Sequence, residues 1–205
     1  MKQRSPAEVD AALARYAALI RRYHGTLDLV SGAALERLSD HLAEAWAYAD
    51  LVADLSPAPA RLADLGSGVG LPGVVLAAAL PELPVELIER RRKRTAFLSM
   101  AVAAVGPTCA EVRLGDARRL EGPALDVVTA QAVGPLTEIY AATRHRHGEA
   151  VVLVARKGAG WRAEVDALED RLGATPEVLA ALPRPGHGTL LAVRALGGRP
   201  CPSSE

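Results

Sequence analysis

The stretch RLADLGSGVGLPG, residues 61–73, decides the fold of this chain. A short apolar run leads into glycines at positions 66, 68 and 70, and Pro72 follows where a helix begins. Glycine tolerates positive φ angles, and it lacks the Cβ atom that would keep a ligand away from the backbone. A strand, a tight glycine turn and a helix in succession are typical of open α/β sheets, which bind ligands at the carboxyl ends of their strands. The stretch therefore predicts a ligand site in this turn.

Short apolar runs alternate with helical patterns throughout the rest of the chain. The runs that predict strands are 61–65, 85–88, 111–114, 125–129, 150–155 and 190–193. The helical patterns between them lie near 71–80, 91–104, 135–146 and 161–172. This alternation favours a doubly wound, parallel sheet. A weaker run at 177–179 is expected to pair with the last strand as a terminal hairpin.

The first sixty residues have a helical pattern of their own. Ser5, Pro6 and Glu8 form a capping box with proline at the first helical position, and Gly25 is expected to end that helix. A second pattern runs over 35–49. We therefore expect an N-terminal helical cap over residues 1–59, an α/β domain over 60–196, and a disordered tail over 197–205.

The composition limits the classes of function. The 205 residues carry 24 basic and 24 acidic side chains and a single Phe, which counts mildly against nucleic-acid binding through net charge or base stacking. We find no apolar run of about 20 residues and no secretory signal in the sequence. The two cysteines have no zinc-binding spacing. We expect a cytoplasmic protein without metal or membrane partner.

Two nucleotide cofactors are compatible with the glycine turn. Residues 68–73 fit the dinucleotide fingerprint G-x-G-x-x-G, with Glu89 as its ribose-binding acid. However, the negative charge of Asp64 would repel a pyrophosphate and suits the cationic amino acid and sulfonium of S-adenosylmethionine. The glycines also begin at Gly66, so the turn is longer than a compact dinucleotide loop. The sequence therefore favours S-adenosylmethionine, with Asp64, Gly66 and Gly68 among its binding residues.

Two further acids follow predicted strands. Glu89 can accept hydrogen bonds from both ribose hydroxyls, or it can pair with the arginines that follow it. Asp116, after the third strand, can hold the adenine amine or serve an ordinary turn.

The run Arg90–Arg94 places five positive charges at the start of a helix, where the helix dipole favours anions. We expect Arg91, Arg92 and Arg94 to bind RNA phosphate, with Lys157 as a further contact, although a solvated charged face is the alternative. His24 and His41 are expected in packing or polar pairs. His145 and His147 are expected in a solvated helix cap.

Several segments together resemble the rRNA methyltransferase family RsmG, also called glucose-inhibited division protein B. The segments, which together cover roughly residues 10–195, are YHGTLDLVS at 23–31, the turn at 64–73, LIERRRKRTAFL at 87–98, DVVT at 126–129 and ARKG at 155–158. The resemblance implies a Rossmann-like class I S-adenosylmethionine-dependent methyltransferase. It also implies transfer of the methyl group to guanine N7 in small-subunit rRNA, as free rRNA or in the assembled small subunit.

By position, the resemblance implies that the cofactor is touched by Gly66, Leu71, Ala117, Arg118 and Gln131. The chain also departs from the family pattern. Gln131 stands where the family usually has arginine, Asp40-His41 replaces an Arg-His pair, and Gly188-Thr189 replaces another. Two other functions stay open, a methyltransferase for a small molecule and a non-catalytic binding protein that retains the fold.

Overall fold

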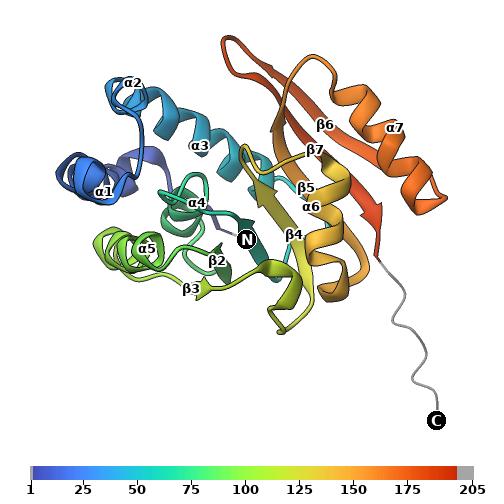
Figure 1. Ribbon diagram of the computed structural model, residues 1–205, viewed down its shortest axis with the longest axis horizontal. Coiled ribbons are helices and arrows are strands. Elements are labelled where there is room, and N and C mark those ends of the chain that lie inside the picture. The colour runs from blue at the N-terminus through green and yellow to red at the C-terminus, as the bar shows by residue number, and fades with distance from the viewer. Residues whose placement is uncertain (1, 198–205) are drawn as a thin grey trace.

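The computed structural model describes residues 2–197, which form three N-terminal helices followed by an α/β unit (Figure 1). The helices of the N-terminal part are α1 (Pro6–Leu27), α2 (Gly32–Glu36) and α3 (Leu38–Ala53). The α/β unit comprises β1 (Leu62–Leu65), α4 (Gly73–Ala79), β2 (Val85–Glu89), α5 (Arg92–Val105), β3 (Ala110–Leu114), β4 (Leu125–Ala130), α6 (Leu136–Thr143), β5 (His147–Lys157), α7 (Trp161–Leu172), β6 (Glu177–Arg184) and β7 (Gly188–Leu196). Two short 3₁₀ turns, η1 (Ala117–Arg119) and η2 (Arg144–Arg146), complete the described elements.

The seven strands form one sheet in the order β3-β2-β1-β4-β5-β7-β6. Strands β1 to β5 are parallel, whereas β7 runs antiparallel to both β5 and β6. The predicted parallel sheet and terminal hairpin are therefore confirmed. Strand order reverses between β1 and β4, so a crevice opens at their carboxyl ends, where open α/β sheets bind ligands.

Helices cover both faces of the sheet (Figure 1). One core contains side chains from α1, α3, α4 and α5, among them Tyr16, Tyr48 and Phe97, all fully buried. The other core lies under α6 and α7 and contains Ile139 and Leu168. The helical cap shares the first core with the α/β unit, so it packs as part of the same body.

Two helix boundaries differ from expectation. Helix α1 continues through Gly25 to Leu27 and ends at Asp28, whose φ of 50° is left-handed and whose N–H bonds back to the His24 carbonyl. A glycine inside a helix costs only about 1 kcal/mol, so it does not have to end one. The second helical pattern is divided at Arg37 into α2 and α3. Within residues 2–197, no helix has both the length and the apolar character needed to cross a membrane. The predicted disordered tail lies outside the described residues except for Gly197.

A buried charge cluster lies in the middle of β2, where the sequence predicted an apolar strand. Glu86 is 1% exposed, and the guanidinium of Arg146 donates to both of its carboxylate oxygens over 2.7 and 2.8 Å. Arg61 and Arg113 approach the same carboxylate at 3.5 and 3.3 Å. Burial alone would raise the pKa of Glu86, but the hydrogen bonds and charge of Arg146 and the two neighbouring cations bring it below the usual value. The cluster is therefore a charged part of the fold, held by three guanidinium groups.

His147 lies in a buried position, so the expectation of a solvated cap was wrong. Its Nε2 lies 2.8 Å from the hydroxyl of Thr143, and its ring meets the ring of Tyr140 edge to face. Because Thr143 donates its hydroxyl proton to the Ile139 carbonyl, His147 donates from Nε2, and its buried Nδ1 has no partner. Burial and the nearby His145 and Arg144 lower its pKa to about 4.

We expect His147 to make folding sensitive to mild acid. Since its pKa is about 4 in the folded protein and about 6.5 in an unfolded chain, the unfolded state binds the extra proton between these values. Stability should therefore fall by about 2 kcal/mol as the pH drops from about 7.5 to 5. Urea unfolding of the wild type and of His147→Phe at both pH values measures this term as the difference between their pH slopes. Equal slopes would contradict it.

Candidate functional site

The glycine turn between β1 and α4 is fixed from several directions. The backbone N–H of Ser67 donates to the Ile88 carbonyl over 3.0 Å, and the Ser67 hydroxyl donates to the Asp64 carbonyl over 2.9 Å. On the other side, the buried hydroxyl of Tyr16 in α1 donates to the Val69 carbonyl over 2.8 Å. The turn is thus held by the neighbouring strand and by the helical cap.

Gly68 occupies the part of the turn that faces the pocket. Its φ is +56°, a left-handed conformation in which side chains are strained. A Cβ atom here would lie 3.6 Å from the nearest side-chain atom, Nη1 of Arg94, so neighbouring protein atoms leave room for a side chain. The left-handed backbone conformation is therefore the reason that glycine is required. The turn therefore leaves a clear backbone surface for a ligand.

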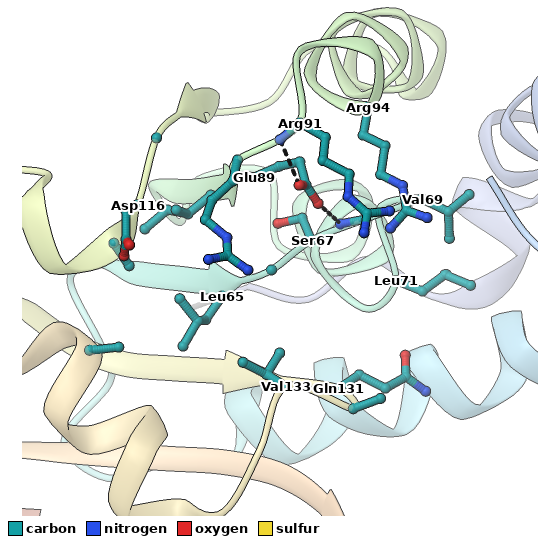
Figure 2. A pocket seen from close by; sticks show the side chains of 18 of the residues that line it. Leu65, Ser67, Val69, Leu71, Glu89, Arg91, Arg94, Asp116, Gln131 and Val133 are labelled. Carbon is teal, nitrogen blue, oxygen red and sulfur yellow. Dashed lines mark hydrogen bonds between the residues drawn. The ribbon is translucent and has the colours of Figure 1, made fainter. Parts of the chain in front are cut away.

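A pocket of about 630 Å³ opens at the carboxyl ends of the strands, a volume typical of small-molecule sites. Its walls come from the glycine turn, the ends of β2, β4 and β5, the η1 turn and the helical cap. Seven of the eight residues predicted to bind the cofactor line it together: Gly66, Gly68, Leu71, Glu89, Ala117, Arg118 and Gln131. In Figure 2, Glu89 and Asp116 lie on one side of this pocket, and Gln131 and Val133 lie on the other.

Glu89 presents its carboxylate at the end of β2 (Figure 2). One oxygen accepts from the backbone N–H of Gly68 over 3.1 Å, and the other accepts from the backbone N–H of Arg91 over 2.9 Å. The carboxylate is 7% exposed and bonds to backbone, so it does not pair with the guanidinium groups that follow it. Each oxygen keeps a second lone pair, which leaves room for two ribose hydroxyls.

Asp116 lines the pocket next to Ala117 and Arg118. Its side chain accepts from the backbone N–H of Arg118 over 3.1 Å and so caps the η1 turn. The expected turn role and the expected pocket position therefore occur together.

Asp64 does not face the pocket, and this prediction was wrong. Its side chain is 1% exposed, and Oδ1 accepts from the Thr129 hydroxyl over 2.8 Å. Oδ2 points to the first turn of α4, where a Cβ added to Gly73 would lie only 2.6 Å away. Burial raises the pKa of Asp64 to about 6 in spite of the Thr129 hydrogen bond. Asp64 therefore joins β1 to β4 beneath the turn, its Oδ2 is buried beside α4 without a hydrogen-bond partner, and the residue does not line the cavity.

Four side chains from distant segments meet beside the β5 end of the pocket, and we call them the Arg–His cluster: Arg37, His41, Arg156 and His187. Arg156 and His41 line the pocket. Arg156 Nη1 lies 3.3 Å from His187 Nδ1, and Arg37 Nη2 lies 3.4 Å from His187 Nε2. The His41 and His187 rings meet edge to face with centroids 6.4 Å apart.

Sequence reasoning missed this cluster. It placed His41 in packing or in a polar pair and expected Gly188-Thr189 in place of an Arg-His pair, whereas His187, one residue earlier, takes part in the contacts. The cluster joins residues up to 150 positions apart, so no local pattern marks it.

Gln131 connects the cluster to the glycine turn. In the amide orientation that satisfies both neighbours, Nε2 donates to the Leu71 carbonyl over 3.2 Å and Oε1 accepts from Arg156 Nη2 over 3.3 Å. An uncharged amide can therefore hold Arg156 in a position where a second guanidinium would repel it.

Part of the basic run lines the pocket. Arg90, Arg91 and Arg94 line the main cavity, and Arg94 also donates to the Asp28 carbonyl over 3.1 Å. Residues 91–94 line a second hollow of about 330 Å³ together with residues 26–28 at the end of α1. Two of the three arginines that the sequence assigned to RNA, Arg91 and Arg94, therefore share the main cavity with the predicted cofactor residues. Arg92 and Lys93 belong only to the second hollow.

Lys157 is not placed to meet RNA, and this prediction is also corrected. The residue is 8% exposed, and its ammonium donates to the Glu164 carboxylate over 2.8 Å and to the Gly134 carbonyl over 2.5 Å. The ammonium is therefore paired with Glu164, and the ion pair joins β5 to α7. In the described part of the chain, no three His, Cys, Asp or Glu side chains gather in a way that could hold a metal ion.

Solved structures share the fold at low sequence identity. Magnesium protoporphyrin IX methyltransferase from Synechocystis, with bound SAH, superposes with a TM-score of 0.60 over 89% of this chain and 100% of its own, at 15% identity. The O-methyltransferase TomG from Streptomyces achromogenes gives 0.57 over 91% and 90%, at 17% identity. The predicted class I methyltransferase fold is confirmed.

Proteins with higher sequence identity to this chain share one name. Proteins named ribosomal RNA small subunit methyltransferase G are 39% identical in Acidothermus cellulolyticus, over 83% of this chain and 72% of the relative, and 34% identical in Halorhodospira halophila, over 92% and 91%. The relative in Nocardioides sp. is 39% identical over 73% of this chain, which spans 62% of its length. The family model described as GidB, rRNA small subunit methyltransferase G, matches residues 10–184. The chain therefore belongs to the rRNA small subunit methyltransferase G family.

Proposed function

We propose that this protein transfers the methyl group of S-adenosylmethionine to N7 of a guanine in small-subunit rRNA. The observation that carries the proposal is the family match over residues 10–184, which spans most of the cap, the glycine turn and the sheet strands as far as β6. Methylation of small-subunit rRNA is the activity for which the family is named. The atom N7 follows from the resemblance in the motifs, and a cytoplasmic location follows from this substrate.

The residues of the pocket fit S-adenosylmethionine. Gly68 leaves open backbone for the amino-acid part, Gly66 and Leu71 line the same turn, and Glu89 offers a buried carboxylate for the ribose hydroxyls. Ala117 and Arg118 lie after β3, where we place the adenine. When bound, the cofactor supplies a methyl group already activated by the positive sulfur.

The chain has a limited chemical task in this reaction. Guanine N7 carries a free lone pair and no proton, so methylation at this atom requires no general base. The pocket residues must hold the base so that its nitrogen, the methyl carbon and the sulfur lie in line. Gln131, after β4, and Arg156, in β5, are placed to orient the acceptor. Glu89 and the glycine turn hold the donor.

A transfer assay tests the proposed function. Purified protein and tritiated S-adenosylmethionine would be incubated with assembled small subunits, with deproteinised small-subunit rRNA and with a small-molecule extract, all from cells that lack this enzyme. We expect label in rRNA from at least one of the first two samples, and mass mapping should locate it as N7-methylguanine. The labelled sample also identifies the form of the substrate. Label confined to the small-molecule extract would contradict the proposal and favour a small-molecule methyltransferase.

We expect Arg92 and Lys93 to bind RNA phosphate without affecting the cofactor, because they line only the second hollow. Changing both to glutamine should weaken RNA binding and make the log–log salt dependence shallower by about one to two units. Affinity for S-adenosylhomocysteine should stay unchanged. Fluorescence anisotropy at several salt concentrations measures the first effect, and calorimetry measures the second. As a control, Arg162→Gln with Arg171→Gln removes two charges from α7 and should leave the slope intact.

A further inference from the structure

The Arg–His cluster offers more hydrogen-bond donors than its own members can accept. The guanidinium groups of Arg156 and Arg37 approach the two nitrogens of one imidazole, that of His187, at 3.3 and 3.4 Å. A neutral imidazole accepts at one nitrogen and donates at the other, and a protonated imidazole accepts at neither. At least one guanidinium N–H therefore faces a nitrogen that cannot accept it.

The cluster also carries unbalanced positive charge. In the described part of the chain, Asp40 is the one carboxylate that forms an ion pair with a member of the cluster. Its partner is Arg37, at 3.3 Å. Burial and the charges of Arg156 and Arg37 lower the pKa of His41, which favours its neutral form. Arg156 is only partly exposed and its remaining acceptor is the uncharged amide of Gln131. Two guanidinium charges thus face one carboxylate.

The position of the cluster matches that of an acceptor. Across the sheet, the pocket residues run from Ala117 after β3 and Glu89 at the end of β2, past the turn after β1, to Gln131 after β4 and Arg156 in β5. Adjacent strands lie about 4.8 Å apart, so Arg156 is roughly 14 Å across the sheet from the β2 end. Arg156 and His41 therefore lie at the end of the cavity away from the proposed ribose site.

We propose that Arg37, His41, Arg156 and His187 bind a backbone phosphate of the RNA strand that carries the acceptor guanine. Phosphate oxygens accept the N–H groups that His187 cannot, and their negative charge balances the two arginines. Arginine also binds phosphate through two parallel hydrogen bonds, which fixes orientation as well as affinity. Phosphate contacts position a nucleic acid while base contacts specify it, so this site sets where the guanine enters the pocket. The inference rests on the proposed function, because it takes RNA as the substrate.

Binding of guanosine 5′-monophosphate and of guanosine to the protein saturated with S-adenosylhomocysteine tests the site. We expect the wild type to bind the nucleotide about ten-fold more tightly than the nucleoside, the scale of one charge-assisted hydrogen bond. Arg37→Gln and Arg156→Gln should each remove most of this preference, and Arg37→Gln, which lies outside the pocket lining, should leave guanosine affinity unchanged. Arg162→Gln, on α7, is the matched control and should keep it. If Arg156→Gln lowers the Tm, Arg156→Lys and the exposed Arg37→Gln decide the result. If the preference for the nucleotide over the nucleoside survives in Arg37→Gln and also in the folded Arg156 variant, the proposal is overturned.

Kinetics on the rRNA substrate give a second measurement. For Arg37→Gln and Arg156→Gln, we expect KM for the RNA to rise about ten-fold, while KM for S-adenosylmethionine stays at the wild-type value. If the wild type methylates rRNA but these variants match Arg162→Gln in KM, the phosphate site is wrong and the proposed function stands. If no rRNA is methylated but the nucleotide preference depends on Arg156, the proposed function fails, and the cluster binds the phosphate of a nucleotide that is not part of the rRNA strand.

Discussion

Replacing Gly68 by valine is expected to abolish measurable binding of S-adenosylhomocysteine. The residue has a φ of +56°, which a β-branched side chain adopts only with strain of about 1–3 kcal/mol. The new side chain would also project toward the pocket, since the protein leaves open space at this position. Its N–H, which donates to Glu89, would be displaced as the turn relaxes. Calorimetric titration should show affinity reduced at least 100-fold.

A second glycine provides a matched control. Gly106, at the end of α5, also has a positive φ of 93°, and a Cβ atom there meets no other atom within 4 Å. Gly106→Val should therefore lose stability of the same order but retain cofactor affinity. Wild-type affinity in Gly68→Val would show that the ligand does not approach this turn, and the site would have to be placed elsewhere.

Replacing Arg146 by alanine should destabilise the protein by about 3–5 kcal/mol. The change removes two hydrogen bonds from the buried carboxylate of Glu86 and leaves its charge with only the longer contacts from Arg61 and Arg113. Urea unfolding measures the loss. The double variant Glu86→Met with Arg146→Met removes both charges and should recover most of the stability, because apolar replacement of a buried ion pair is often neutral. A single variant that loses less than about 1 kcal/mol would mean that water reaches Glu86.

The strand and helix order could be predicted because it rests on local periodicity. The central strands β1, β2 and β4 are short and largely buried runs, and the hairpin after α7 is marked by its turn residues. The buried charges could not be predicted this way. Glu86 and Arg146 are separated by 60 residues, and only the folded sheet brings them within 2.7 Å. His147 was misassigned for a different reason. Its partners Thr143 and Tyr140 are close in sequence, but His147 begins the buried strand β5 and does not end a solvated helix.

The candidate site was predicted best where the signal is continuous in sequence. The glycine turn and Glu89 at the end of β2 line the pocket, as the motif indicated. Two errors come from strand alternation, because neighbouring side chains in a strand point to opposite faces. Leu65 lines the pocket while Asp64 points toward α4. In the same way Arg156 faces the pocket, whereas Lys157, which was assigned to RNA, turns to Glu164.

The hydrogen bond from Tyr16 to the Val69 carbonyl couples the docking of α1 to the binding of the cofactor. Helix α1 lines none of the main pocket, yet its fully buried tyrosine can hold the turn only while the helix is docked. A ligand that requires the ordered turn therefore binds the docked state alone, and its binding free energy adds to the cost of local opening of α1. At 100 times the Kd, this linkage amounts to about 2.7 kcal/mol, or a hundred-fold slower amide hydrogen exchange in a helix that the ligand never touches.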